Sequence, residues 1–319
     1  MSAAAPTISP LAFQGLEELP APVSGQRHEI ASQVGRLTYY SAGPDSAGKS
    51  PPLLLIHSIN AAGSAYEIKP LYEYYRQSRT VYALELPGFG HSERGKREYS
   101  VRMMTDAILI MVREIQDVHG RGPIDALAVS LSSEFLARAV TEMPLAVRSV
   151  ALVSPTGFRS RDATTKWRDG TRAKPWLHAV FEFPLWSESF FRLLTSRAGI
   201  RYFLNKTWGS DDFDKGLADY DYLTTHQPGA QHAPYYFVSG YLFSEDITRI
   251  YHSLTLPVWM AHGDRGDFVD YTNEALVKGR ANWTIEVFST GAMPHFEARA
   301  AFVQAYDAFL AGAPAASSA

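Results

Sequence analysis

The chain has 319 residues, of which 46% are hydrophobic and 20% are charged. This composition is typical of a globular protein that can bury one sizeable core. The formal net charge of −3 gives no electrostatic reason to expect nucleic acid or an anionic membrane as a partner. Because the chain has no cysteine, disulfides, thiolate metal sites and cysteine nucleophiles are excluded. Small molecules are the expected partners.

Both ends of the chain are rich in Pro, Ala and Ser, and residues 1–26 and 313–319 are expected to be flexible. The N-terminus lacks the basic opening and the continuous apolar stretch of a secretory signal, so we expect a cytoplasmic protein. No window approaches the roughly 20 apolar residues that a membrane span requires.

The first half of the folded chain predicts alternating strands and helices. From Arg27 onward, two strands are expected around a turn at Gly35, followed by the buried strands PPLLLIHS and TVYALELPGFG. Apolar residues spaced by three and four predict a helix over 101–118. The strand IDALAVS, a helix from Leu131 and the strand RSVALVS follow. This order predicts an α/β fold, a mostly parallel sheet with helices on both faces.

The second half interrupts this alternation and then resumes it. LPVWMAHG and WTIEVFS predict strands separated by a helix near 271–280, and a last helix is expected over about 295–311. Residues 156–252 are far longer than the dozen or so residues that a crossover needs. We therefore interpret them as a helical cap inserted into a core made of residues 27–155 and 253–312.

Several motif matches fail on their context. GPDSAGKS at 43–50 fits the phosphate-loop pattern, but Pro51, Pro52 and a strand follow where a helix is required, so a loop is predicted. GFGHSE lacks the third glycine and the helix of a dinucleotide site. NKT and NWT match the glycosylation sequon, which matters only in a secreted chain. The histidines lack metal-binding spacing, so neither a metal nor a cofactor is expected.

The stretch ALAVSLSS at 126–133 has the setting of a nucleophile elbow. The predicted strand ends one residue before the helix, and only Ser130 lies between them. Such a turn holds a serine on strained backbone at the carboxyl end of the sheet, and the residues two before and two after must be small. Ala128 and Ser132 meet that requirement.

A base and acids occur later in the chain. His295 is expected in a turn between the last strand and the last helix. The loop MAHGDRGDFVDY carries Asp264, Asp267 and Asp270 directly after a strand. The order Ser, Asp, His along the chain is the order found in α/β-hydrolases.

On these residues the chain resembles the α/β-hydrolase superfamily over about 27–312. LLLIHSINAAGSAYEIKPL is similar to the family loop that follows the third strand, and LELPGFGHSER is similar to the turn after the fourth. The resemblance implies that Ser130 is the nucleophile and His295 the base. It also implies an oxyanion hole made by the backbone N–H groups of Ile59 and Leu131.

The resemblance leaves the acid open. The family usually places the acid three residues after the strand-ending glycine, which here is Gly263. That position is occupied by Gly266, so a shift of one residue makes Asp267 the first choice, with Asp264 as the alternative.

Some positions depart from the family pattern. Ser58, Ala128 and Ser132 stand where the family usually has glycine, which bears on the geometry of the oxyanion hole. Ser132 and Ser133 are expected to be small packing residues. Asn60 is expected to make a loop hydrogen bond rather than to serve as an oxyanion donor.

The resemblance implies a serine hydrolase that works through an acyl-enzyme without a cofactor. Aromatic segments of the cap, KPWLHAVFEFPLWSESFFRLL and HAPYYFVSGYLF, favour an apolar pocket and a small-to-medium apolar carboxylic ester as substrate. Two alternatives stay open. One is a carbon-carbon bond hydrolase or cofactor-free lyase with the same triad, and the other is a non-catalytic binding protein of this fold.

Overall fold

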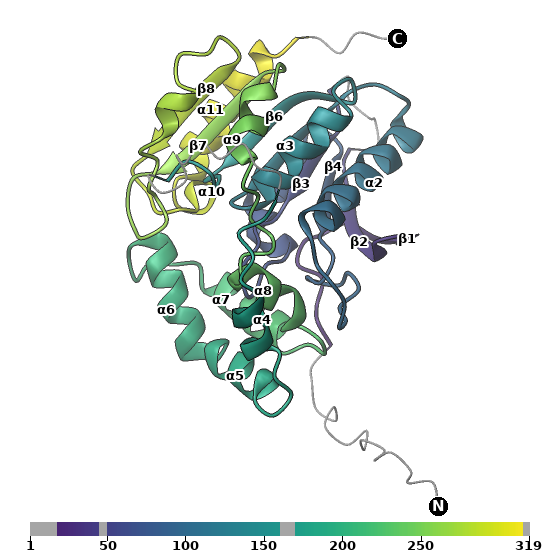
Figure 1. Ribbon diagram of the computed structural model, residues 1–319. Helices are drawn as coiled ribbons and strands as arrows, with labels where there is room; N and C mark the ends of the chain where they lie inside the picture. Colours follow the sequence, from purple (N-terminus) through teal and green to yellow (C-terminus); the bar gives the residue numbers. More distant parts are fainter. Residues whose placement is uncertain (1–17, 45–49, 160–169, 315–319) are drawn as a thin grey trace, which may run out of the picture.

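The computed structural model describes residues 18–44, 50–159 and 170–314. An eight-stranded sheet with the order β1-β2-β4-β3-β5-β6-β7-β8 forms its centre (Figure 1). The pairs β1/β2 and β2/β4 are antiparallel and the other five pairs are parallel. The strands are β1 (Gln26–Ser32), β2 (Gly35–Ala42), β3 (Leu53–Ile56), β4 (Val81–Glu85), β5 (Ile124–Val129), β6 (Val147–Val153), β7 (Val258–Gly263) and β8 (Trp283–Phe288). The predicted mostly parallel α/β fold is confirmed.

Helices cover both faces of the sheet, and a further group of helices forms the lower part of the molecule in Figure 1. The helices of the sheet layers are α1 (Lys69–Tyr75), α2 (Val101–His119), α3 (Ser132–Glu142), α9 (Ile247–Ser253), α10 (Pro294–Glu297) and α11 (Arg299–Gly312). The lower group, which we call the cap helices, comprises α4 (Pro175–Phe181), α5 (Ser187–Leu194), α6 (Arg197–Trp208), α7 (Lys215–Thr225) and α8 (His232–Val238). Two short 3₁₀ helices are η2 (Ala65–Ile68) and η4 (Glu274–Leu276).

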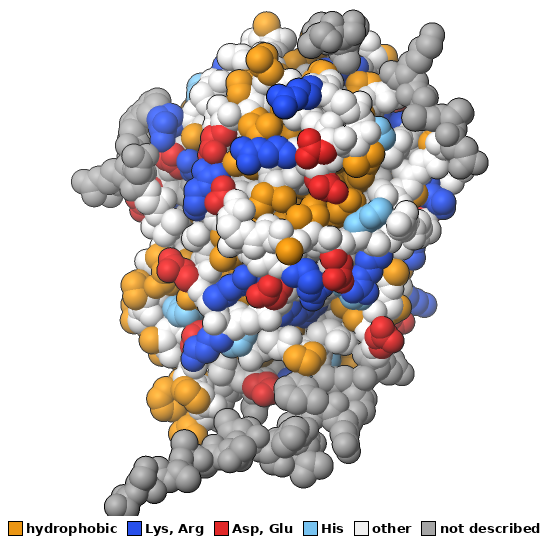
Figure 2. Space-filling model, turned by 90° about the vertical axis from the view of Figure 1, so that its right-hand side faces the viewer, with side chains coloured by type: hydrophobic (Ala, Val, Ile, Leu, Met, Phe, Trp, Pro, Cys, Tyr) orange, Lys and Arg blue, Asp and Glu red, His pale blue; other side chains and the backbone are white. Residues whose placement is uncertain are grey.

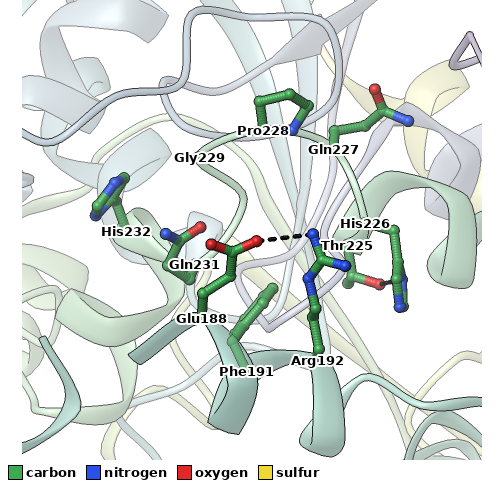
Figure 3. Close-up of a pocket in the computed structure, with 10 residues that line it drawn as sticks. All are labelled: Glu188, Phe191, Arg192, Thr225, His226, Gln227, Pro228, Gly229, Gln231 and His232. Carbon is green, nitrogen blue, oxygen red and sulfur yellow. Dashed lines mark hydrogen bonds and ion pairs between the residues drawn. The ribbon is translucent and has the colours of Figure 1, made fainter. Parts of the chain in front are cut away.

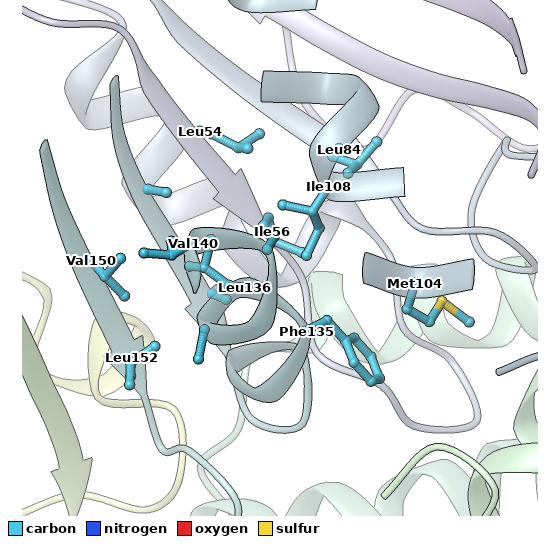
Figure 4. Packing of buried hydrophobic residues seen from close by; sticks show 14 of the residues in the cluster. Leu54, Ile56, Leu84, Met104, Ile108, Phe135, Leu136, Val140, Val150 and Leu152 are labelled. Atoms are coloured by element: carbon cyan, nitrogen blue, oxygen red, sulfur yellow. The ribbon is translucent and has the colours of Figure 1, made fainter. Parts of the chain in front are cut away.

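The central strands are apolar on both faces because each face packs against helices. On β3, Leu54 and Ile56 join the cluster under α2 and α3, whereas Leu53 and Leu55 join the cluster on the opposite face. Figure 4 shows the first cluster, in which sheet residues meet side chains of the two helices: Leu54, Ile56, Leu84, Val150 and Leu152 on strands and Met104, Ile108, Phe135, Leu136 and Val140 on helices. This two-sided burial explains why these strands lack apolar–polar alternation.

The long helix α2 follows its sequence signals closely. Ser100 caps its start by accepting a hydrogen bond from the amide of Met103, and Gly120 follows its last residue with a φ of 85°. A serine at the N-cap and a glycine at positive φ beyond the end are both common at helix boundaries. The predicted helix over 101–118 is confirmed.

Two helix predictions near the C-terminus were wrong in detail. The helix expected near 271–280 is reduced to η4, because Asn273 binds the backbone of Phe158 through its amide and that of Arg159 through its side chain. The last helix is divided at Ala298, which has a non-helical φ of −122° and ψ of 41°. His295 therefore lies in a separate short helix.

The folded region begins upstream of Arg27. Leu19 and Val23 are buried, and both the amide and the hydroxyl of Ser24 donate to the Glu73 carboxylate. The expectation of a flexible segment up to residue 26 was therefore wrong for residues 18–26, the last of which begins β1. The remaining predicted ends, 1–17 and 315–319, and most of the GPDSAGKS loop, 45–49, lie outside the described residues.

The cap helices are attached to the core at several points. Arg94 donates to the carbonyl of Thr224 at the end of α7. The amide of Ala292 donates to the carbonyl of Thr207 in α6. The amide of Ser244 donates to the buried carboxylate of Glu134 on α3. The exact bounds of the cap as a domain stay a prediction. Among the described residues, no helix is both long and apolar enough to cross a membrane.

Candidate active site

Ser130 occupies the predicted strand-to-helix turn. It is one of two described non-glycine residues with positive φ, at 54°, and it lies between β5 and α3. Its amide donates to the carbonyl of Val153 on β6, and its carbonyl accepts from the amide of Ser133. A left-handed conformation is strained for a serine and persists where the surroundings enforce it, which is typical of functional sites.

The two predicted oxyanion donors have unpaired amides. Within the described residues, the N–H groups of Ile59 and Leu131 form no hydrogen bond. Both residues are buried, and Leu131 is the N-cap residue of α3. Buried backbone amides are rarely left without a partner, so these two N–H groups are available to an incoming acceptor.

Glu67 holds the loop that carries Ile59. Its buried carboxylate accepts from the amide of Ser58 at 2.7 Å, from the hydroxyl of Ser58 at 3.0 Å and from the side-chain amide of Asn60 at 2.6 Å. The expectation that Asn60 makes a loop hydrogen bond is thus confirmed. Ser58, which stands where the family has glycine, contributes through its hydroxyl to fixing the loop.

Ser132 links the elbow to the same loop. Its hydroxyl donates to the carbonyl of His57 at 2.6 Å. His57 in turn donates through Nδ1 to the carbonyl of Ser58 and accepts from the amide of Leu86 at Nε2. Ser132 is fully buried, as a packing residue would be, but it also connects α3 to the loop after β3.

His295 is fully buried beside Phe296 and Phe302. Its Nε2 lies 2.7 Å from the backbone carbonyl of Glu67. Because a carbonyl can only accept, Nε2 carries the proton, and Nδ1 keeps a lone pair. Nδ1 is buried and has no hydrogen-bond partner. Burial lowers the pKa of His295 to about 4, so the ring is neutral at pH 7.

Neither predicted acid contacts His295. Asp267 is 54% exposed at its side chain and pairs with Lys206 of α6 at 2.5 Å, and its amide donates to the Lys206 carbonyl. Asp264 is exposed and accepts from the hydroxyl of Ser289 at 3.4 Å. Within the described residues, His295 makes no hydrogen bond to Ser130 either. The chain order is therefore that of a triad, but the hydrogen bonds of a triad are not formed.

Sequence reasoning missed Ser154. This residue follows β6, has a φ of 47°, and is the second described non-glycine residue with positive φ. Its amide donates to Ala261 on β7, and its hydroxyl donates at 2.7 Å to the carbonyl of Ala292, in the loop before His295. The sequence signal was a buried strand that ends in serine, the same pattern that identified Ser130.

Sequence reasoning also missed Asp221 on α7. It is only 7% exposed, and its Oδ1 is buried without a partner. Burial, followed by the nearby charges of Glu67 and Asp214, raises its pKa well above the ordinary value. The Asp221 carboxyl group of the cap therefore lies near the carboxylate of Glu67, which holds the loop that carries Ile59. No local pattern in the sequence distinguishes this aspartate.

Aromatic residues of the cap contact the loop after β3 that carries Ile59 and Ala61. Phe191 and Tyr235 form a buried cluster with Ala230, and Ala61, two residues after Ile59, packs against it. Phe181 stacks on Tyr235 with ring centres 5.3 Å apart. An apolar wall thus lies against Ala61, two residues after Ile59.

Two pockets lie near the cap helices, and neither is lined by Ser130 or His295. Figure 3 shows the first, of about 110 Å³, between α5 and the connection from α7 to α8. There Glu188 and Arg192 pair at 2.7 Å and face His226 and Gln231 across the space. The second lies between the end of α6 and α10. The described arrangement thus keeps Ser130 outside both pockets.

The family model described as the alpha/beta hydrolase family matches residues 53–305. A probable hydrolytic enzyme from Pseudomonas aeruginosa PAO1 has a similar structure, with a TM-score of 0.67, 16% identity and coverage of 92% of this chain and 96% of that chain. A carboxylesterase from Bacillus subtilis gives 0.65 at 15% identity, with 91% and 93% covered. An enol-lactonase from Burkholderia xenovorans LB400 gives 0.65 at 15% identity, with 89% and 100% covered. No curated protein gives a significant match to the sequence. The structural similarities at these identities show a shared fold, and because the family match spans most of the sequence, the chain belongs to the alpha/beta hydrolase family.

Proposed function

We propose that the protein is a serine hydrolase that cleaves a small-to-medium apolar carboxylic ester through an acyl-enzyme on Ser130. The main support is the elbow: Ser130 has a φ of 54°, and the buried amides of Leu131 and Ile59 have no partner within the described residues. A strained nucleophile together with free N–H donors is the arrangement that acyl transfer requires.

In the proposed mechanism Ser130 Oγ attacks the ester carbonyl carbon while His295 takes its proton. The Glu67 carbonyl fixes the proton of His295 on Nε2, so Nδ1 is the nitrogen that can act as the base. The imidazolium then protonates the leaving alkoxide, and water, activated by the same ring, releases the acid. The two amides stabilise the tetrahedral oxyanion, an effect worth about 3 to 4 kcal/mol per donor.

The role of the acid is proposed separately. Asp267 remains the first candidate and Asp264 the alternative, as their order in the chain suggests. In the described arrangement, the Glu67 carbonyl orients the ring, and Asp267 is bound to Lys206. Asp267 can serve as the triad acid only when that ion pair opens and the Nε2–H of His295 leaves the Glu67 carbonyl for the carboxylate.

The aromatic cluster beside Ala61 supports an apolar acyl or alkyl group. Two of the similar structures are named as a carboxylesterase and an enol-lactonase, and the proposed reaction is of the same kind.

The proposal is tested by labelling with a fluorophosphonate and by turnover of p-nitrophenyl butyrate. Wild type and Ser133→Ala should gain one adduct by intact mass, and Ser130→Ala should gain none and lose turnover. Ser133 is a suitable control because it is buried three residues away and, among the described residues, its hydroxyl binds only the carbonyl of Ala128. Folded wild type with neither adduct nor turnover would show a non-catalytic binding protein. An adduct without ester turnover would favour carbon-carbon bond or lyase chemistry, and vinylogous diketones would then be assayed.

A further inference from the structure

The cap helices expose an unusual number of large apolar side chains. Leu185 is 84% exposed, Leu193 70% and Trp176 67%, and Trp186, Phe183 and Tyr202 are also exposed. We call these six residues the cap surface. Monomeric proteins rarely expose contiguous apolar patches of this kind unless the patch binds something.

The members of the cap surface come from adjoining segments. Trp176 lies on α4, Leu193 on α5 and Tyr202 on α6, and the rest lie between α4 and α5. Phe181 of α4 stacks on Phe190 of α5, with ring centres 5.7 Å apart, which holds these two helices together. Figure 1 places α4, α5 and α6 in the lower part of the molecule, and Figure 2 shows apolar side chains along its lower left edge at the same level.

Positive charge accompanies this apolar surface. Residues 170–206 contain six Lys or Arg and two Asp or Glu. Three of these cations form ion pairs, Arg192 with Glu188, Arg197 with Asp219 and Lys206 with Asp267. Lys174 and Arg201 are exposed, and neither forms an ion pair with any described residue. The cap surface thus combines exposed tryptophan, tyrosine and leucine with these two cations, which we call the cationic margin, although the rest of the protein is acidic.

We propose that the cap surface binds the surface of an anionic lipid bilayer, with its apolar side chains inserted among the headgroups. Tryptophan and tyrosine favour the membrane interface, and leucine gains free energy from the acyl boundary. Lysine and arginine beside such residues are attracted to anionic headgroups. The positive charge of the cationic margin complements the negative charge of the lipid headgroups.

A second copy of the chain fits the same surface less well. A two-fold symmetric dimer brings the same patch of both subunits together, so the cationic margins would face each other. An anionic bilayer removes that repulsion and also covers the apolar side chains. This inference concerns binding alone, and it neither requires nor supports the proposed ester hydrolysis.

The test measures sedimentation with vesicles. Wild type should bind vesicles of phosphatidylcholine and phosphatidylglycerol (3:1) more strongly than pure phosphatidylcholine, and the difference should shrink as salt screens the charges. Leu185→Gln should weaken binding to the mixed vesicles about tenfold, because one inserted leucine is lost. Leu145→Gln is the matched control, since Leu145 is 90% exposed in the turn between α3 and β6, outside the cap helices.

The charge contribution has its own pair of variants. Lys174→Gln combined with Arg201→Gln should weaken binding to the mixed vesicles and leave binding to phosphatidylcholine unchanged, whereas Arg121→Gln, at an exposed site outside the cap, should change neither. Melting temperatures of all variants confirm that they are folded. Absence of sedimentation with either vesicle, or equal losses in Leu185→Gln and Leu145→Gln, would overturn the proposal. So would a concentration-dependent dimer that Leu185→Gln dissociates, because a second copy would then cover the surface.

Discussion

Glu67→Gln is the most informative single change, because Glu67 connects the loop that carries Ile59, the proposed oxyanion donor, to His295. One carboxylate oxygen accepts from the hydroxyl of Ser58 and the side chain of Asn60, and the other accepts from the amide of Ser58. Glutamine keeps one acceptor oxygen and places an NH₂ group where the second oxygen was. Two donors then face each other at a site that is only 3% exposed.

The size of the effect follows from these contacts. A hydrogen bond to a charged group contributes about 1.5 to 3 kcal/mol, and a buried donor without a partner costs about 1 to 3 kcal/mol. We therefore expect the free energy of unfolding to fall by about 2 to 4 kcal/mol. Because Ile59 lies between Ser58 and Asn60, its amide loses its fixed position. The loss of one oxyanion donor costs up to about 10² to 10³ in kcat, and partial misplacement should cost about 10 to 100.

The assay separates kcat from KM with p-nitrophenyl butyrate, together with urea unfolding. An oxyanion donor acts in the transition state, so kcat should fall and KM should change little. Glu73→Gln is the matched control, since Glu73 also accepts from a serine amide and hydroxyl, those of Ser24, but lies on α1 and makes no described contact with the site. It should lose stability and keep kcat. An unchanged kcat in folded Glu67→Gln, or an equal fall in Glu73→Gln, would refute the reasoning.

Five further predictions concern titration, the acid and the substrate. The pKa of His295 is lowered to about 4 from 6.5, so kcat/KM should stay constant down to about pH 5, and an acid limb near pH 6.5 would contradict this. Between pH 6.5 and 4 only the unfolded chain binds the His295 proton, so stability should fall as the pH is lowered through that window, and less so in His295→Gln. Burial raises the pKa of Asp221 in the folded state, so ionised Asp221 costs stability as the pH rises above its ordinary pKa. Asp221→Asn, which mimics the neutral acid, should therefore raise the melting temperature more at pH 8 than at pH 5. A lower melting temperature of Asp221→Asn at pH 8 would contradict the raised pKa. As the proposed triad acid, Asp267 should lose about three orders of magnitude of turnover in Asp267→Asn, whereas a less than tenfold loss would show that its carboxylate stays with Lys206 at the surface. Turnover of p-nitrophenyl esters should rise from acetate to about C4 to C8, by up to about 0.8 kcal/mol per methylene, and a steady decline from acetate would contradict an apolar pocket.

The sequence by itself determined the sheet and the strand-to-helix turn that holds Ser130. Strands such as β3 and β5 could be predicted because a strand buried on both faces must be apolar throughout. Helix α2 could be predicted because apolar residues recur every three to four positions along its buried face. Ser130 could be found because the turn is local: β5 ends at Val129 and α3 begins at Ser132, with only Ser130 and the N-cap residue Leu131 between them. The shortening of the helix to η4 could not be predicted from the sequence, since the contacts of Asn273 with Phe158 and Arg159, more than 100 residues away, decide it.

Only the tertiary structure decided how the site is connected. Glu67 reaches Ser58 and Asn60 through its side chain and His295, 228 residues away, through its carbonyl, and no sequence pattern records a contact of that range. Asp267 has the right place in the chain order, but the end of α6 brings Lys206 to its carboxylate. The cap aromatics pointed to a pocket, yet a run of tryptophan, phenylalanine and leucine reads the same whether its side chains face inward or outward. Phe191 is buried and Leu185 is exposed, and that difference arises because the packing of the cap helices covers one of them and leaves the other to solvent.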